Sequence, residues 1–153
     1  AGIINAQRSK PVATGADAIS LAAREIAETL KLSAIVTYTA SGTTGLRAAR
    51  ERPQVPIIAL SPIVNTARRM SLLWGTHCVV SPDARDLDDM VDRACRIAHE
   101  ENFGKKGDRI IITAGVPLRT PGSTNMLRIA YIGIDEGSVD PERGKITPQK
   151  APR

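Results

Sequence analysis

The sequence predicts an α/β protein, a three-layer α/β/α sandwich built around a five-stranded mixed sheet. Segments with helical periodicity alternate along the chain with short runs of aliphatic and β-branched residues. Aromatic residues are scarce, with one Trp, two Tyr and one Phe among 153 residues, so the core has to consist of Ala, Ile, Leu and Val. Residues 109–113 form a continuous apolar run, which is typical of a strand covered on both faces.

The first predicted element is a helix that begins near Thr14. This threonine is followed three residues later by Asp17, a spacing that resembles a capping box. The apolar positions that follow it are Ile19, Ala22, Ala23, Ile26, Ala27 and Leu30. Their spacing places one apolar stripe on a helix that faces the core. Residues 34–38 then form a short apolar strand.

Hydroxyl side chains and a glycine follow this strand directly. They are Thr39, Ser41, Gly42, Thr43 and Thr44, and a helix-forming run at 45–50 comes next, which Pro53 must end. Free N–H groups and the positive end of the helix dipole favour an anion at such a helix start. Gly42 permits a close approach of the backbone, and the hydroxyls can donate hydrogen bonds to phosphate oxygens. An ordinary turn with Ser/Thr caps is the alternative, and the loop alone does not decide between the two.

The remaining elements complete the alternation. We place strands at 55–60, 77–80, 109–113 and 126–132, and helices at 63–74 and from Asp83 to about Asn102. Ser61-Pro62 is interpreted as a cap with proline at the first helical position, and Gly75 as the stop. Because no helix fits into the Gly/Pro-rich loop at 114–125, the last strand is predicted to run antiparallel to its neighbour.

The chain is predicted to hold one domain at residues 14–133. Residues 1–13 are interpreted as an incoming linker and residues 134–153 as a polar tail, to which no fold is assigned. The net charge of +5 is scattered over helices and few aromatics accompany it, so an affinity for small anions is favoured over nucleic-acid binding. We expect a cytoplasmic protein, because no leader or membrane-spanning run is visible and Cys78 and Cys95 lie in apolar runs without metal-ligand spacing.

Five segments occur in one order along residues 13–133: TGADAISLAAREIAETL, TASGTT, TARRMSLLWG, KKGD and PGSTN. In this order they resemble the C-terminal domain of pyruvate kinase. The resemblance implies the sheet order 3-2-1-4-5 with the fifth strand antiparallel. In such a sheet a crevice opens at the carboxyl ends of the first and fourth strands, where open α/β sheets bind ligands.

The resemblance also implies an allosteric effector site in this crevice. The phosphate of the effector falls on the hydroxyl loop, that is on Thr39, Ser41, Gly42, Thr43 and Thr44. The second loop, which is the Gly/Pro-rich loop at 114–125, is expected to close over the ligand. Arg119 is its candidate cation, and Gly122, Ser123 and Thr124 are further contacts. Arg119 is equally well explained as a solvated loop charge. Arg47 lies one helical turn beyond the first loop, and it faces either the site or solvent.

The chain departs from the family pattern at two places. Members regulated by fructose 1,6-bisphosphate hold the second phosphate with a Trp and an Arg near the start of the fourth helix, and here Asp83 and Met90 occupy those places. Without that pair a bisphosphate loses its charge-assisted contacts. The prediction is therefore a monophosphate effector: a hexose phosphate, a pentose phosphate or AMP.

The resemblance places catalysis elsewhere. In the family, transfer of a phosphoryl group from phosphoenolpyruvate to ADP takes place on a separate (β/α)₈ barrel that also binds Mg²⁺ and K⁺, and its motifs are absent from this chain. We expect no turnover by this chain alone, a catalytic barrel domain as its partner, and a homo-oligomer, which is a tetramer in the family. Two alternatives stay open: a small isomerase of sugar phosphates, which would need a Glu or His near the pocket, and a structural oligomerisation module. His77 and His99 have no sequence partner that suggests a triad or a metal site.

Overall fold

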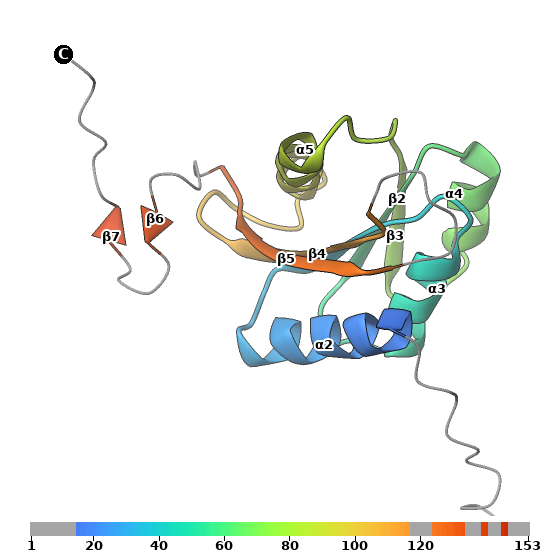
Figure 1. Cartoon of the computed structure of the whole chain (residues 1–153), viewed down its shortest axis with the longest axis horizontal. Helices are drawn as coiled ribbons and strands as arrows, with labels where there is room; N and C mark the ends of the chain where they lie inside the picture. Colours follow the sequence, from blue (N-terminus) through green and yellow to red (C-terminus); the bar gives the residue numbers. More distant parts are fainter. Residues whose placement is uncertain (1–14, 117–123, 134–138, 141–144, 147–153) are drawn as a thin grey trace, which may run out of the picture.

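A computed structural model describes residues 15–116, 124–133, 139–140 and 145–146 (Figure 1). The elements are α2 (Gly15–Thr29), β1 (Ala34–Tyr38), α3 (Thr43–Arg50), β2 (Ile57–Ser61), α4 (Val64–Met70), β3 (Thr76–Val80), α5 (Leu87–Glu100), β4 (Arg109–Ala114), β5 (Met126–Tyr131), β6 (Val139–Asp140) and β7 (Lys145–Ile146). Their order confirms the predicted alternation of helices and strands.

The first five strands form one mixed sheet in the order β3-β2-β1-β4-β5. All neighbours are parallel except β4 and β5, which are antiparallel. At the centre of the sheet Val36 of β1 pairs with Ile58 of β2 and with Ile112 of β4. The strand order and the antiparallel last strand are thus confirmed. The reversal follows from the short β4–β5 connection, since a parallel return requires a longer crossover.

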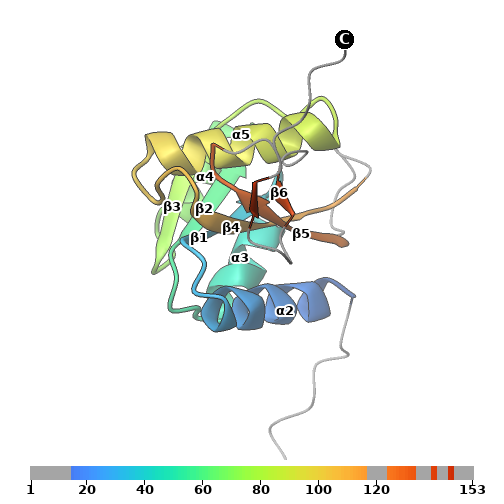
Figure 2. The same ribbon diagram turned by 90° about the vertical axis from the view of Figure 1, so that its left-hand side faces the viewer.

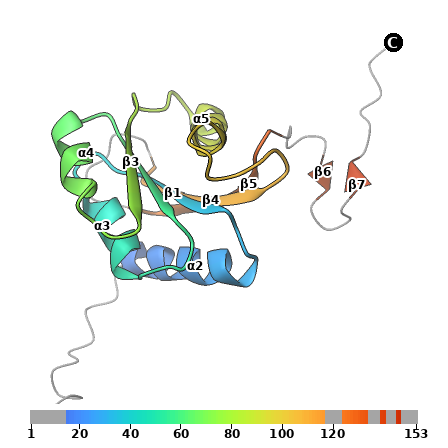
Figure 3. The same cartoon turned by 180° about the vertical axis from the view of Figure 1, so that it is seen from behind.

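The helices cover both faces of this sheet, as Figures 1 and 2 show, with α5 on one side and α2 and α3 on the other. Seen from behind, α4 lies beside α3 next to β3 (Figure 3). Successive residues of β1 point to opposite faces: Ala34 and Val36 pack in the cluster beneath α5, and Ile35 packs in the cluster beneath α2 and α3. Because both faces are buried, β1 and β4 can be apolar throughout their centres.

Helix α4 is shorter than predicted, since it ends at Met70 and not at 74. Beyond Met70 the backbone hydrogen bonds change to the tighter pattern of a 3₁₀ turn, in which each N–H bonds three residues back. For example, Leu73 N–H donates to the Met70 carbonyl at 3.0 Å. These turns leave Leu72 86% and Trp74 81% exposed. The predicted Ser61 cap is also wrong. Ser61 ends β2, and Ile63 occupies the cap position without a side-chain bond to the helix.

Helix α5 begins at Leu87, four residues after the predicted start. Asp86 caps it, and its carboxylate accepts a hydrogen bond from Asp89 N–H at 2.8 Å. The capping box predicted for α2 depends on Thr14, which lies outside the described residues. In the tail, where the sequence indicated no structure, β6 and β7 form a short antiparallel pair. Within the part of the chain that the structure describes, no helix combines the length and apolarity needed to span a bilayer.

Candidate functional site

The site lies where β1 and β4 end at the same edge of the sheet. The two strands are parallel neighbours, and Thr37 of β1 is in register with Thr113 of β4. β1 ends at Tyr38, and the hydroxyl loop begins at the next residue. β4 ends at Ala114, and the second loop follows it. The sheet therefore brings together two loops that lie far apart in the sequence, as expected for a ligand site of an open α/β sheet.

The hydroxyl loop is held by its own side chains. Gly42 has φ +94° and forms the start of α3, and its N–H donates to Thr39 Oγ1 at 2.9 Å. Ser41 Oγ and Thr43 Oγ1 share a hydrogen bond of 2.9 Å. Thr39 is 4% exposed, whereas Ser41 is exposed. Thr39 thus holds the loop from its buried side, whereas Ser41 lies on the exposed side of the loop.

A hydrogen bond connects the first loop to the second. Thr44 Oγ1, in the first turn of α3, lies 2.7 Å from Thr124 Oγ1. Thr124 is buried just before β5, and the neighbouring Asn125 side chain donates to the Val116 carbonyl at 2.7 Å across the mouth of the second loop. Arg119, Gly122 and Ser123 lie outside the described residues. Of the four second-loop candidates, Thr124 is the one that the structure places at the site.

Helix α4 supports the hydroxyl loop, which sequence reasoning missed. Thr66 Oγ1 donates to the Ala40 carbonyl at 2.9 Å, and Arg69 Nη2 lies 3.3 Å from the Ser41 carbonyl oxygen and 3.5 Å from Thr66 Oγ1. Thr66, Arg69 and Met70 share one helix face, because they are spaced at i, i+3 and i+4. That spacing was visible in the sequence, but only the fold shows that this face meets the loop.

Two glycines allow the close packing of α3 against α4. A Cβ atom at Gly42 would lie 3.1 Å from Met70 Cε, and one at Gly45 would lie 2.9 Å from Met70 Sδ. Gly42 combines this close contact with a positive φ, which L side chains rarely adopt. The glycine therefore serves both the backbone conformation of the loop and its contact with α4.

The charges around the loop differ from those expected. Arg47 does not turn toward the loop, because its Nε lies 3.4 Å from Asp17 Oδ1 of α2. Asp17 neutralises Arg47 and joins the first turn of α2 to α3. Arg69 has no carboxylate within ion-pair distance among the described residues, and its Nη2 contacts a carbonyl oxygen and a hydroxyl instead. It is therefore the cation that the described structure directs at the loop.

The first turns of α5 lie at the same edge of the sheet, because α5 follows the carboxyl end of β3. Met90 is completely buried, and its carbonyl accepts a hydrogen bond from Tyr38 OH at 2.7 Å. Burial raises the pKa of Tyr38 above its usual value. Asp89 accepts from Arg85 N–H at 2.8 Å and pairs with Arg93 at 3.0 Å, and chiefly the bond from Arg85 lowers the pKa of its carboxyl. The Met90 side chain, which is completely buried, therefore has no surface with which to contact a ligand.

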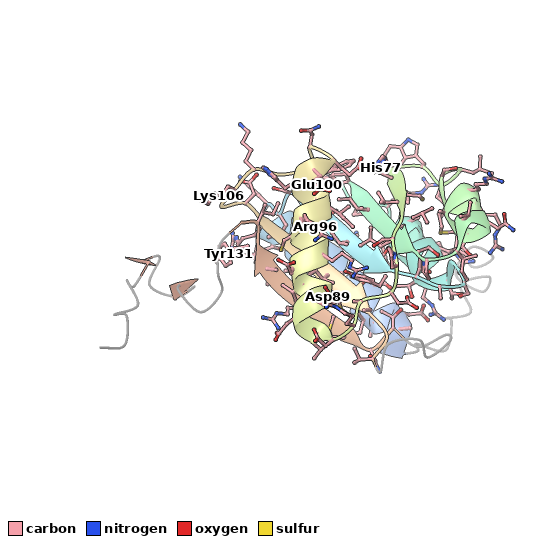
Figure 4. The ribbon with its side chains drawn as sticks, turned by 90° about the horizontal axis from the view of Figure 1, so that it is seen from above. His77, Asp89, Arg96, Glu100, Lys106 and Tyr131 are labelled. Carbon is pink, nitrogen blue, oxygen red and sulfur yellow. The ribbon has the colours of Figure 1, made fainter. Side chains whose placement is uncertain are left out.

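Groups with acid–base potential lie at the opposite end of α5. Figure 4 shows Asp89 near one end of this helix and Glu100 and His77 near the other. His77 Nε2 lies 3.0 Å from Glu101 Oε2 and its ring packs on Phe103. Cys78 and Cys95 form no disulfide, and Cys95 is buried with its Sγ 3.6 Å from the Tyr131 carbonyl oxygen. The described residues contain no group of three or more His, Cys, Asp or Glu that could hold a metal ion.

Comparison with known proteins agrees with this architecture. The family model described as "Pyruvate kinase, alpha/beta domain" matches residues 17–130, most of the chain. The chain belongs to the pyruvate kinase family. The matched residues contain most of α2, the elements from β1 to β4 and most of β5, together with the hydroxyl loop and Thr124.

Individual pyruvate kinases match over the same region. The enzyme of Methylorubrum extorquens is 52% identical over 130 residues, which is 85% of this chain and 27% of that protein. One from Agrobacterium vitis is 39% identical and covers 86% of this chain and 28% of its own length. The structure of Cryptosporidium parvum pyruvate kinase in complex with ADP superposes with a TM-score of 0.71 at 29% identity, over 86% of this chain and 26% of that one. The chain thus spans about a quarter of the length of these pyruvate kinases.

Proposed function

We propose that this chain is the regulatory domain of a pyruvate kinase and that it binds a phosphorylated metabolite at the hydroxyl loop. The observation that carries the proposal is the 2.7 Å hydrogen bond between Thr44 and Thr124. It joins two loops from neighbouring strands at the edge where open α/β sheets hold ligands. A ligand bound there would contact both loops, and its binding would affect the conformation of both.

The first loop offers the groups that a phosphate needs. Ser41, Thr43 and Thr44 carry hydroxyls near the start of α3, where the first N–H groups of a helix have no carbonyl partner within the helix. Ser41 and Thr43 bond to each other, and a phosphate oxygen would replace this mutual bond. We propose Gly122, Ser123 and Arg119 of the second loop as further contacts.

A single phosphate suits the site better than two. At the start of α5 Met90 is buried and Asp83 is an acid, so neither can hold a second phosphate. Sugar monophosphates such as glucose 6-phosphate or ribose 5-phosphate, and AMP, are the proposed effectors.

The chain is proposed to act with a catalytic domain and to have no turnover alone. That domain would transfer the phosphoryl group between phosphoenolpyruvate and ADP in the cytoplasm, with Mg²⁺ and K⁺ bound there.

The exposed apolar side chains Leu72 and Trp74 support such a partner. Trp74 borders a groove of about 820 Å³, which Leu46, Ala49, Pro53 and Leu73 also line. About three quarters of the length of the relatives lies outside the region matched by this chain. We propose that the catalytic part of the enzyme covers this surface.

Homo-oligomers, tetramers of the complete enzyme, are also proposed on the family resemblance. The isomerase alternative finds less support. The base that it requires would have to come from His99, Glu100 or Glu101, and these residues lie at the end of α5 opposite the loop.

Calorimetric titration of this chain tests the effector proposal. Glucose 6-phosphate, ribose 5-phosphate, AMP and fructose 1,6-bisphosphate are compared, with glucose as the control that lacks phosphate. We expect saturable binding of at least one monophosphate, weakened by Ser41→Ala and by Thr44→Val. Equal binding of glucose, binding unaffected by both substitutions, or clear preference for the bisphosphate contradicts the proposal.

A further inference from the structure

We propose that Arg69 of α4 is a cation of the effector site and binds the phosphate group directly. The inference rests on the proposed function and adds to it a residue from an element outside both loops. The hydroxyl loop itself contains hydroxyls, amides and glycine but no positive charge. A phosphomonoester carries close to two negative charges at neutral pH, so hydroxyls and amides alone leave most of its charge without a partner.

The position of Arg69 meets this need. Its Nη2 lies 3.3 Å from the Ser41 carbonyl oxygen and 3.5 Å from Thr66 Oγ1, so the guanidinium stands against the loop. Thr66 in turn donates to the Ala40 carbonyl at 2.9 Å. The arginine is thus held at the loop by residues on both sides, and its side chain is solvent-exposed and free to accept a ligand.

Arg69 differs from the five arginines of the described structure that form ion pairs with carboxylates. Ion pairs with carboxylates hold Arg24, Arg47, Arg85, Arg93 and Arg96. Arg69 reaches instead toward a neutral carbonyl at the edge of the site, at a distance longer than a typical hydrogen bond. A guanidinium has five N–H donors in a planar fork, so Arg69 can keep one on Ser41 and offer others to a phosphate.

The same geometry assigns a second role to α4. A phosphate held between Ser41 and Arg69 would add a contact between the loop and α4, and α4 continues into the segment that exposes Leu72 and Trp74. Through Arg69, effector binding would therefore affect the surface that is proposed to contact the catalytic domain.

The test compares Arg69→Gln with Arg68→Gln. Arg68 is the neighbouring exposed arginine, its side chain has no recorded bond in the described structure, and its loss changes the net charge equally. With glucose 6-phosphate, ribose 5-phosphate and AMP as ligands, Arg69→Gln should weaken binding by about 10- to 100-fold, as expected for loss of a charged hydrogen bond. Arg68→Gln should change it by less than about 3-fold, and Arg69→Lys should restore part of the affinity.

A second readout uses Trp74, the single tryptophan of the chain. Saturating effector should change its fluorescence in the wild-type chain, and less so in Arg69→Gln at matched saturation. Thermal melting checks that each variant is folded. If Arg69→Gln and Arg68→Gln weaken ligand binding equally, the loss of affinity is explained by the change in net charge alone, and the inference is overturned.

The failures of the two proposals are distinguishable. If Ser41→Ala weakens binding while Arg69→Gln binds as tightly as wild type, the loop binds phosphate without Arg69, and only the further inference is wrong. If the wild-type chain binds none of the three monophosphates, the proposed function is wrong, and the role of Arg69 is rejected with it.

Discussion

The hydroxyls of Thr44 and Thr124 share a hydrogen bond of 2.7 Å although 80 residues of sequence separate them. One belongs to the first turn of α3 and the other lies just before β5, so the bond joins the ends of β1 and β4. Thr124 is 2% exposed, and its hydroxyl cannot turn to water instead. The bond is therefore a structural link between the two loops as well as a part of the proposed site.

Removing one hydroxyl of this pair should cost stability. Thr44→Val leaves the buried Thr124 hydroxyl without this partner, which we expect to lower the free energy of unfolding by about 1 kcal/mol. The double variant Thr44→Val/Thr124→Val should be less destabilised than the sum of the single variants, because it removes both partners. Urea denaturation of the four proteins measures the coupling. Strict additivity would show that the two hydroxyls do not interact.

Gly42→Ala should destabilise more than Gly75→Ala. Both glycines have positive φ, +94° and +71°, so alanine is strained at each by about 1 kcal/mol. A Cβ at Gly75 meets nothing within 4 Å, whereas one at Gly42 meets Met70 Cε at 3.1 Å. We expect a total loss near 2 kcal/mol at Gly42 and a weakened effector affinity only there. Thermal denaturation with calorimetric titration compares them, and equal losses would argue against the Met70 contact.

The acid stability of the domain should depend on Asp89. Its pKa is lowered in the folded state by the Arg85 N–H bond and by the arginines beside it. A lowered folded pKa means that the ionised carboxylate stabilises the fold above its unfolded pKa, near 4, and that this contribution is lost as the pH falls through the folded pKa. Asp89→Asn should therefore lower the stability at pH 6 and flatten its decline below about pH 4.

Urea denaturation between pH 2.5 and pH 6 measures this dependence. Asp92→Asn is the matched control, because Asp92 is exposed on the same helix and has no recorded bond in the described structure. A pH profile of Asp89→Asn that parallels the wild type would contradict the assignment.

Trp74 should contribute little to the fold. It is 81% exposed, so Trp74→Ala should change the free energy of unfolding by less than about 0.5 kcal/mol. Leu32→Ala, at a residue 4% exposed, should cost about 3 kcal/mol. Trp74 fluorescence should have the long-wavelength emission of a hydrated indole and be quenched readily by acrylamide. Emission at short wavelength in the dilute chain would mean that this surface is already covered.

Local sequence patterns were sufficient for the order of helices and strands, because apolar periodicity and turn residues act over a few neighbouring positions. The ranges of β1 and β4 agree within a residue with those predicted. The end of α4 was predicted four residues too late. Leu72, Leu73 and Trp74 continue the apolar run, but nothing in the run itself indicates that Leu72 and Trp74 lie in exposed turns.

The sequence by itself determined the α/β class, the antiparallel last strand and the hydroxyl loop at the start of α3, because each follows from the residue types and lengths of adjacent segments. Only the tertiary structure decided that Thr39 turns inward, that Arg47 pairs with Asp17, and that Arg69 stands against the loop. These contacts depend on which strands are neighbours and on how closely α3 approaches α4. Such distances arise from the packing of whole elements and leave no periodic trace in the chain.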